Sequence, residues 1–482
     1  MRLYLINPFN PLVSITKGGY RNKYRVWKPL GLLVVAGLTP PGWEISVFDE
    51  NTGVPDYSIL PPPDLVGITA FTSQAARAYE LAAEFRARGV PVVMGGIHAS
   101  MCPEEARARV DVVVMGEAEG VWGQVLEDAE RGTLKRVYKG SFVEMDEIAP
   151  ARHDLLPAGY RFGSIQTTRG CPLNCTFCSV SAFNGRRYRH RPIEHVVEEM
   201  AQIKEKYVLV VDDNLFGTRK DHVARSKALL RAMIDAKLGK KWMCQATANM
   251  ADDEEMIELA AKAGCFGVFI GFETATKEGL TEIHKKINCQ TGRDAKDCVQ
   301  RIQRHGIAVV GGFVMGLDVD LAGVGLQIAD AANHYGVAAM NVLILTPLPG
   351  TALWDKLDGE GRILSKSFPA DWQYYTLNHP VARYKHLSWT DIVREMSDCQ
   401  RRFYSVPRIA LRTLATAWRT RKLSCVLAIL RTNLSYRLNL RNDRETYRSM
   451  ELSQGEAMEK SGAKAVPYRM LRNTIRRTLP AH

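Results

Sequence analysis

Apolar residues form short runs that alternate with helical patterns along the first 150 residues of the chain. The runs have the length of β-strands, and they lie at 2–7, 44–51, 64–72, 90–100 and 110–120. Helical spacing covers 29–40 and 73–89, where Ser73 is expected to cap the helix and Gly89 to end it. This alternation predicts an α/β domain built on a doubly wound, Rossmann-like parallel sheet with helices on both faces.

The same alternation returns between residues 160 and 360. Helical segments such as 192–206 and 253–264 separate six further apolar stretches. These strand candidates are 164–168, 208–213, 242–248, 267–273, 309–316 and 341–347. Six β/α units are fewer than the eight of a closed barrel. We therefore expect a partial (β/α)6 barrel of the TIM type, with its active face at the carboxyl ends of the strands.

The last region, residues 365–482, is predicted to be helical and basic. Residues 388–405 have a helical pattern that Ser388 or Thr390 could cap, and 408–441 repeats apolar residues every three or four positions with arginines between them. From residue 401 onward 18 lysines and arginines stand against 5 acids, whereas the whole chain carries a net charge of +12. The regions 1–150, 160–360 and 365–482 are interpreted as three domains.

Composition and the N-terminal sequence indicate the cellular compartment in which the chain is expected. No stretch approaches the roughly 18 apolar residues that a membrane-spanning helix needs. The N-terminal sequence MRLYLINPFNPLV has one arginine and only a short apolar run, which is not the pattern of a signal peptide. The ten cysteines are therefore expected in a reducing, cytoplasmic compartment, where clustered thiols favour metal binding or catalysis over disulfides.

Three of these cysteines lie within eight residues, in the stretch TTRGCPLNCTFCSV at 167–180. Cys171, Cys175 and Cys178 have the spacing C-x3-C-x2-C, and no other cysteines form a second C-x2-C pair. Structural zinc takes four protein ligands, whereas three thiolates on a four-iron cluster leave one iron open. His190 could complete a zinc site of three cysteines and one histidine, although the cationic run GRRYRHRP around it disfavours a divalent ion.

The spacing, the aromatic Phe177 before the third cysteine and the position after the first barrel strand resemble the radical S-adenosylmethionine superfamily. This resemblance implies that Cys171, Cys175 and Cys178 hold a 4Fe-4S cluster whose open iron binds S-adenosyl-L-methionine (SAM). One electron then cleaves the sulfonium, and the resulting 5′-deoxyadenosyl radical takes hydrogen from the substrate. In this interpretation the missing fourth ligand is the cofactor itself.

The resemblance also suggests which side chains contact SAM. The backbone near Phe177 is expected to cradle adenine. Asp212 and Asp213 end the second strand, where the family commonly has Gly-Gly-Glu and this chain has Asp-Asp-Asn. Gln245 on the third strand and Glu273 at the end of the fourth complete the set. Each acid alone could be a solvated strand end, and only their joint position at successive strand ends favours a cofactor site.

Residues 1–360 together resemble the cobalamin (B12)-binding class of this superfamily. The expected cobalamin contacts are the small and polar residues at the strand ends of the first domain: Thr69, Ser73, Gly95, Gly96, His98, Gly116 and Glu117. The chain lacks the D-x-H-x-x-G signature of an axial histidine, so His98 is interpreted as a loop contact and not as a cobalt ligand. Glycines at these positions would let the backbone approach a flat corrin.

The resemblance implies methylation of an unactivated carbon in a lipid or secondary metabolite, and no catalytic side chain can be assigned. Two alternatives remain: a radical enzyme that forms or rearranges rings without methyl transfer, and a zinc-stabilised binding protein with a basic tail. A reductant such as flavodoxin or ferredoxin is expected. The basic tail could dock on a membrane surface or pack on the barrel with its arginines solvated, whereas nucleic acid is the least favoured partner.

Overall fold

The computed structural model describes residues 1–10, 12, 28–285, 287, 294–420, 423, 426, 427 and 429–438. Much of the basic C-terminal region, including all of 439–482, therefore lies outside the described residues, as do Cys289 and Cys425.

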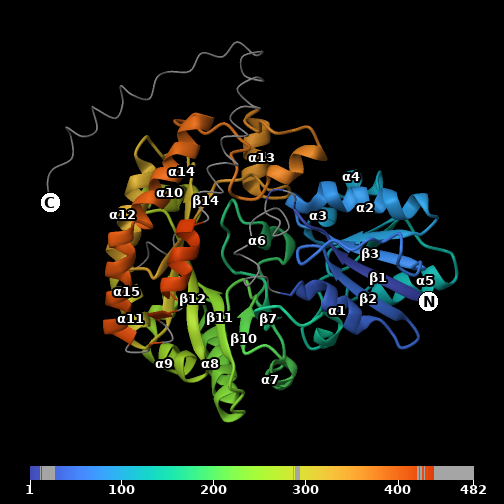
Figure 1. The fold of residues 1–482 in the computed structure, drawn as a ribbon, viewed down its shortest axis with the longest axis horizontal. Coiled ribbons are helices and arrows are strands. Elements are labelled where there is room, and N and C mark those ends of the chain that lie inside the picture. Colours follow the sequence, from blue (N-terminus) through green and yellow to red (C-terminus); the bar gives the residue numbers. More distant parts are fainter. Residues whose placement is uncertain are drawn as a thin grey trace.

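The first sheet has six parallel strands in the order β2-β1-β3-β4-β5-β6 (Figure 1). The strands are β1 Arg2–Asn7, β2 Glu44–Asp49, β3 Leu65–Thr69, β4 Val92–Gly95, β5 Val112–Met115 and β6 Val137–Lys139. The helices are α1 Leu30–Leu38, α2 Ala75–Ala87, α3 Gly96–Met101, α4 Pro103–Arg107 and α5 Trp122–Glu130. The order is that of flavodoxin-like sheets, in which a ligand binds where the order reverses, here between β1 and β3.

The sheet is buried on both faces, which confirms the doubly wound prediction. Leu3 and Leu5 pack into the cluster that contains α1 and α5. Tyr4 and Ile6, the alternate residues of β1, pack on the opposite face with α2. Because both sides of the strand are covered, its sequence is a continuous apolar run and not an alternating one.

The predicted cap of α2 is wrong. Ser73 lies inside a short 3-10 turn, Thr72–Gln74, and Gln74 is the residue that precedes the helix. The Oε1 atom of Gln74 accepts a hydrogen bond from the Phe71 amide at 2.9 Å, which closes the turn. Gly89 does follow the helix, with a φ of +76° that favours glycine there.

The second sheet has six parallel strands in the order β14-β13-β12-β11-β10-β7. The strands are β7 Phe162–Ile165, β10 Tyr207–Val210, β11 Lys241–Ala246, β12 Cys265–Glu273, β13 Ala308–Met315 and β14 Ala339–Ile344. The helices are α7 Ile193–Gln202, α8 Lys220–Asp235, α9 Glu254–Lys262, α10 Lys277–Glu282, α11 Ala295–Arg304, α12 Val324–Tyr335 and α13 Ala352–Gly359. The sheet does not close on itself, so the expected partial (β/α)6 barrel is confirmed. The domain boundary at 150–160 stays a prediction, and it falls between β6 and β7.

One face of the barrel strands remains open. On β11, Trp242, Cys244 and Ala246 are buried against the helices, whereas the alternate residues Met243 and Gln245 are partly or fully exposed. The same alternation recurs along the neighbouring strands, where the partly exposed residues are Leu209, Phe269, Val310, Asn341 and Leu343. Because strand side chains alternate between faces, these residues line the inside of the barrel.

The chain then returns to the first domain before it forms the outer helices α14 Trp389–Phe403 and α15 Val406–Thr420. Ser388 caps α14 as predicted, since its Oγ accepts a hydrogen bond from the Asp391 amide at 3.2 Å. In the returning segment Trp372 is buried among residues of the first domain and stacks on Phe368 with ring centroids 3.6 Å apart. Among the described residues, none of the helices combines the length and apolar character needed to traverse a bilayer.

We expect Trp372→Ala to lower the free energy of unfolding by about 3–5 kcal/mol, because it leaves a cavity between the returning segment and the first domain. Trp372→Phe keeps an aromatic stack and loses the 3.0 Å hydrogen bond from the indole to Glu105, so its cost should be about 1 kcal/mol. Urea unfolding followed by circular dichroism measures both variants. Equal costs would show that the ring packing contributes little.

Candidate functional site

The three clustered cysteines lie on a loop that a two-stranded hairpin closes. Strand β8, Thr168–Arg169, pairs antiparallel with β9, Arg189–His190. The loop between them follows the end of β7 and includes the short helix α6, Ser179–Phe183. Gly170 begins the loop with a φ of +87°, and a Cβ there would lie 2.1 Å from the Arg187 carbonyl oxygen. The tight closure of this cysteine loop therefore requires glycine at its start.

The three thiols are free and partly exposed, and they suit a soft metal. Burial raises the pKa of Cys171 to about 11 and that of Cys175 to about 12, and it also raises the pKa of Cys178. The free thiols are consequently protonated at neutral pH, and a metal that binds them has to release those protons. Three thiols in one loop fit the three protein ligands of a 4Fe-4S cluster with one open iron.

The zinc alternative depends on His190 as the fourth ligand. His190 is exposed on β9, where it pairs with Thr168 across the hairpin. Within the part of the chain that the structure describes, no three histidine, cysteine or acidic side chains converge closely enough to hold a single metal ion.

The two aspartates after β10 hold the loop in different ways. Asp213 accepts hydrogen bonds from the Gly170 amide at 2.9 Å and from the Asn184 side chain at 3.0 Å, so it joins the two ends of the cysteine loop. Burial raises its pKa to about 6. Asp212 is fully buried, and Thr167 and Thr168 donate to both of its oxygens at 2.6–2.8 Å. Protein donors thus already bind both oxygens of Asp212, and its contact with SAM stays a prediction.

Glu273 pairs with a lysine that the sequence analysis missed. Glu273 ends β12 with a φ of +66°, and its Oε1 lies 2.5 Å from the Lys285 Nζ. Burial alone would lower the pKa of Lys285, but Glu273 and the neighbouring Cys175 raise it above the ordinary value. A buried cation thus stands beside the cysteine loop. A single lysine after a helix carries no motif, so only its position in space identifies it.

The other two predicted SAM contacts are Phe177 and Gln245. Phe177 is partly buried against the barrel core. Gln245 is exposed on the inner face of the barrel, as expected of an inward side chain. Their contacts with a cofactor stay predictions.

Two of the glycines predicted to contact cobalamin are already required by the packing of the protein, because a Cβ atom would clash there. A Cβ on Gly96, which has a φ of +86°, would lie 2.6 Å from Thr69 Oγ1, and one on Gly116 would lie 2.4 Å from the Gly140 carbonyl oxygen. Gly95 and Ser73 are partly exposed at the same end of the sheet. Thr69, Ser73, Gly95 and Gly96 are thus partly exposed at this edge and available to a ligand at the switch point of the sheet.

The structure places His98 differently from the loop contact that the sequence predicts. It lies in α3 and not in a loop, and its side chain is fully buried. Its Nε2 is 3.0 Å from the Tyr79 hydroxyl and 3.4 Å from Glu105, and its ring packs edge-on against Trp372. The loop placement was wrong because β4 ends at Gly95, three residues before His98, and the chain continues as helix α3, whereas a contact with cobalamin stays a prediction.

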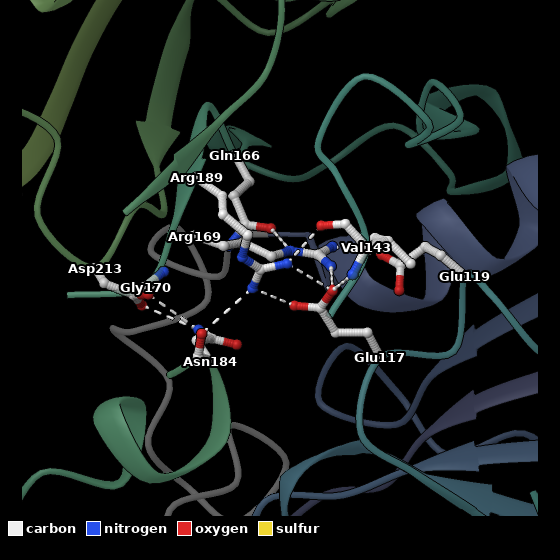
Figure 2. A network of polar contacts seen from close by, with 9 residues as sticks. All are labelled: Glu117, Glu119, Val143, Gln166, Arg169, Gly170, Asn184, Arg189 and Asp213. Atoms are coloured by element: carbon white, nitrogen blue, oxygen red, sulfur yellow. Dashed lines mark hydrogen bonds and ion pairs between the residues drawn. The ribbon is translucent and has the colours of Figure 1, made fainter. Parts of the chain in front are cut away.

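Glu117, which is predicted to contact the corrin, is part of a buried ionic cluster (Figure 2). Its carboxylate accepts from Arg189 at 2.6 and 2.9 Å and from the Val143 amide at 2.8 Å. Arg169 reaches Glu119 at 2.6 Å and Glu117 at 3.5 Å. We call Glu117, Glu119, Arg169 and Arg189 the bridging network, since both acids follow β5 of the first sheet and both arginines belong to the hairpin around the cysteine loop.

Two family profiles match the chain. The radical SAM superfamily matches residues 165–322, and the B12 binding domain matches residues 21–126. The bacteriochlorophyllide d C-12(1)-methyltransferase of Chlorobaculum tepidum is 29% identical, over 78% of this chain and 82% of that protein. The hopanoid C-2 methylase of Rhodopseudomonas palustris is 28% identical, over 70% of this chain and 65% of that protein.

A solved structure has the same fold. The radical SAM methyltransferase TsrM from Kitasatospora setae, with cobalamin and a 4Fe-4S cluster bound, superposes with a TM-score of 0.65 at 17% identity, over 93% of this chain and 99% of that one. At this identity the likeness concerns the fold of the chain.

Removing all three loop cysteines by substitution with alanine should abolish iron incorporation during anaerobic reconstitution, because it removes the three thiolates predicted to hold the cluster. Iron and sulfide analysis, with the charge-transfer absorption of the cluster, measures the effect. Cys102→Ala removes a thiol outside the loop and should retain about four irons per chain. Retention of iron by the triple variant would rule out this ligand set.

Proposed function

Because the chain belongs to the radical SAM superfamily and carries a B12-binding domain, we propose that it methylates an unactivated carbon of a lipid or secondary metabolite. The observation that carries this proposal is the meeting of the two candidate cofactor sites. Helix α3, at the strand-end edge of the first sheet, contacts α6 in the cysteine loop, and the bridging network joins the same two edges. Figure 1 shows α6 between the two sheets.

The residues of the site fit the groups that the two domains imply. Cys171, Cys175 and Cys178 would hold the 4Fe-4S cluster, and the edge around Thr69 and Gly96 would hold cobalamin. When bound, the cluster with SAM supplies a hydrogen-abstracting radical and cobalamin supplies the methyl group.

The chain's own side chains prepare this site. Asp213 fixes both ends of the cysteine loop. Lys285, although paired with Glu273, lies close enough to Cys175 and Cys178 for its cation to interact favourably with their thiolates. A fixed loop and a nearby cation keep the reacting groups in place without rearrangement during the reaction.

The inner face of the barrel points to a substrate with an apolar body. Most of its partly exposed residues are aliphatic or aromatic, among them Leu209, Met243, Phe269 and Leu343, whereas Gln245 and Asn341 add two amides. Apolar walls with a few polar groups bind and orient a hydrophobic small molecule while excluding water. The hopanoid and bacteriochlorophyllide methylases among the relatives act on such molecules.

Product analysis tests methyl transfer against ring formation. Each methylated product should consume two SAM and two electrons, and it should release one S-adenosylhomocysteine, one 5′-deoxyadenosine and one methionine. The assay uses anaerobic protein reconstituted with iron, sulfide and cobalamin, with polycyclic lipids and tetrapyrroles as substrates and mass spectrometry as the readout. Protein reconstituted without cobalamin serves as the control and should give no S-adenosylhomocysteine. Turnover that yields 5′-deoxyadenosine alone would instead support ring formation or rearrangement.

We further propose a reducing, cytoplasmic setting in which flavodoxin or ferredoxin supplies the electrons. All described cysteines are free thiols, as expected where disulfides do not form.

The C-terminal helices support contact with a membrane surface. On α15 the side chains of Val406, Leu411, Leu414 and Trp418 are 59–81% exposed. Residues 401–440 contain lysines and arginines but no acidic residue. An exposed apolar face flanked by cations suits the interface of an anionic bilayer, from which a lipid substrate could be taken.

The wild-type chain should therefore pellet with anionic liposomes at low salt and be released as the salt concentration rises. Trp418→Glu combined with Leu414→Glu should weaken binding at least about tenfold, because it removes apolar surface from the interface and adds charge. Ile59→Glu changes an equally exposed apolar residue in the first domain and should have no effect. Equal pelleting of all three proteins would end this proposal.

A further inference from the structure

We infer that the bridging network is a positioning device that fixes the separation between the cysteine loop and the cobalamin edge. The inference rests on the proposed function, since it concerns how two cofactor sites are kept at one distance. None of the four side chains needs to touch substrate or cofactor for this role.

The acidic and the basic side chains of the bridging network come from different domains. Both acids, Glu117 and Glu119, come from the segment after β5, and both cations, Arg169 and Arg189, come from the hairpin that closes the cysteine loop. The side chains are only 2–11% exposed. Buried ion pairs seldom add to stability, because the loss of hydration offsets their attraction. Such a cluster instead raises the free energy of any arrangement of the two domains in which an acid is separated from its arginine.

On the barrel side, the network holds both ends of the cysteine loop. Arg169 is two residues before Cys171, and the intervening Gly170 is bound to Asp213. Arg189 donates to the carbonyl oxygen of Asn184, the residue that ends α6 after the third cysteine. Asn184 in turn donates to Asp213, so the arginines and the loop form one connected set (Figure 2).

On the other side, the network reaches the cobalamin edge through two hydrogen bonds. Gly116, next to Glu117, donates its amide to Ser100 Oγ at 2.9 Å. Ser100 donates to the Gly96 carbonyl oxygen, also at 2.9 Å. Gly96 is the glycine that packs on Thr69 at the switch point of the sheet. A shift of the network would therefore move the backbone at both candidate sites.

A second ionic contact between the two halves provides a matched control. Lys28 precedes α1 and lies 2.9 Å from Glu205, which follows α7, and their side chains are 3% and 12% exposed. Glu205 packs beside Gly163 at the start of β7, at the opposite end of that strand from the cysteine loop. Its loss should weaken the contact between the halves without displacing either cofactor site.

The test compares Glu119→Arg, Arg169→Glu, the double variant that exchanges the two charges, and the control Lys28→Glu. Each full-length protein is reconstituted anaerobically with iron, sulfide and cobalamin. The readout is the enhancement of cobalt(II) spin relaxation by the reduced cluster, which depends steeply on the distance between them and needs no substrate. A second readout is the ratio of S-adenosylhomocysteine to 5′-deoxyadenosine during turnover. Glu119→Gln replaces any single variant that does not fold.

The enhancement should be lost or broadened in each single variant, should return in the double variant and should be unchanged in Lys28→Glu. Misplacement of the reacting groups by about 1 Å can slow a reaction about a hundredfold, so methyl transfer should fall while 5′-deoxyadenosine continues to form. Unchanged relaxation in the single variants, or an equal loss in the control, would overturn the inference. A wild-type enzyme that shows the relaxation but transfers no methyl group would instead refute the proposed function alone.

Discussion

Four charged side chains buried where the two sheets meet constrain the arrangement of this molecule. Glu117 and Glu119 on one side neutralise Arg169 and Arg189 on the other. Charges that have lost their water are tolerated only when partners with good geometry replace it, and withdrawing one partner leaves the other uncompensated. The two domains can therefore approach one another in few ways, and the way that satisfies these charges places the cysteine loop against the edge of the first sheet.

The same requirement explains why acids at strand ends have such different roles. Asp212, Glu117 and Glu273 lie at or just after strand ends and are buried, and Asp213 beside them is partly buried. A buried carboxylate needs hydrogen-bond donors, and here the protein supplies them from threonine hydroxyls, loop amides, arginines and a lysine. Most of these acids consequently organise the loops around a cofactor site, although the sequence pattern alone suggests direct contact with the cofactor.

On the inner face of the barrel, by contrast, apolar side chains remain partly exposed. Its apolar residues stay partly exposed although the alternate residues on the same strands are buried. An open apolar surface is costly in water, so its retention beside the cysteine loop is consistent with a bound hydrophobic substrate. The returning segment around Trp372 follows the barrel and packs on the first domain. It therefore adds a further contact between the two domains.

The sequence by itself determined the two parallel sheets, the partial barrel and the cysteine motif, although it did not predict β6 or the β8–β9 hairpin. These features follow from local periodicity and spacing, which a single chain displays directly. Only the tertiary structure decided that His98 is buried, that Lys285 pairs with Glu273, and that Glu117 meets Arg189, 72 residues away. The physical reason is that the partner of a buried polar group depends on which distant segments are brought together out of water, and no local pattern encodes that choice.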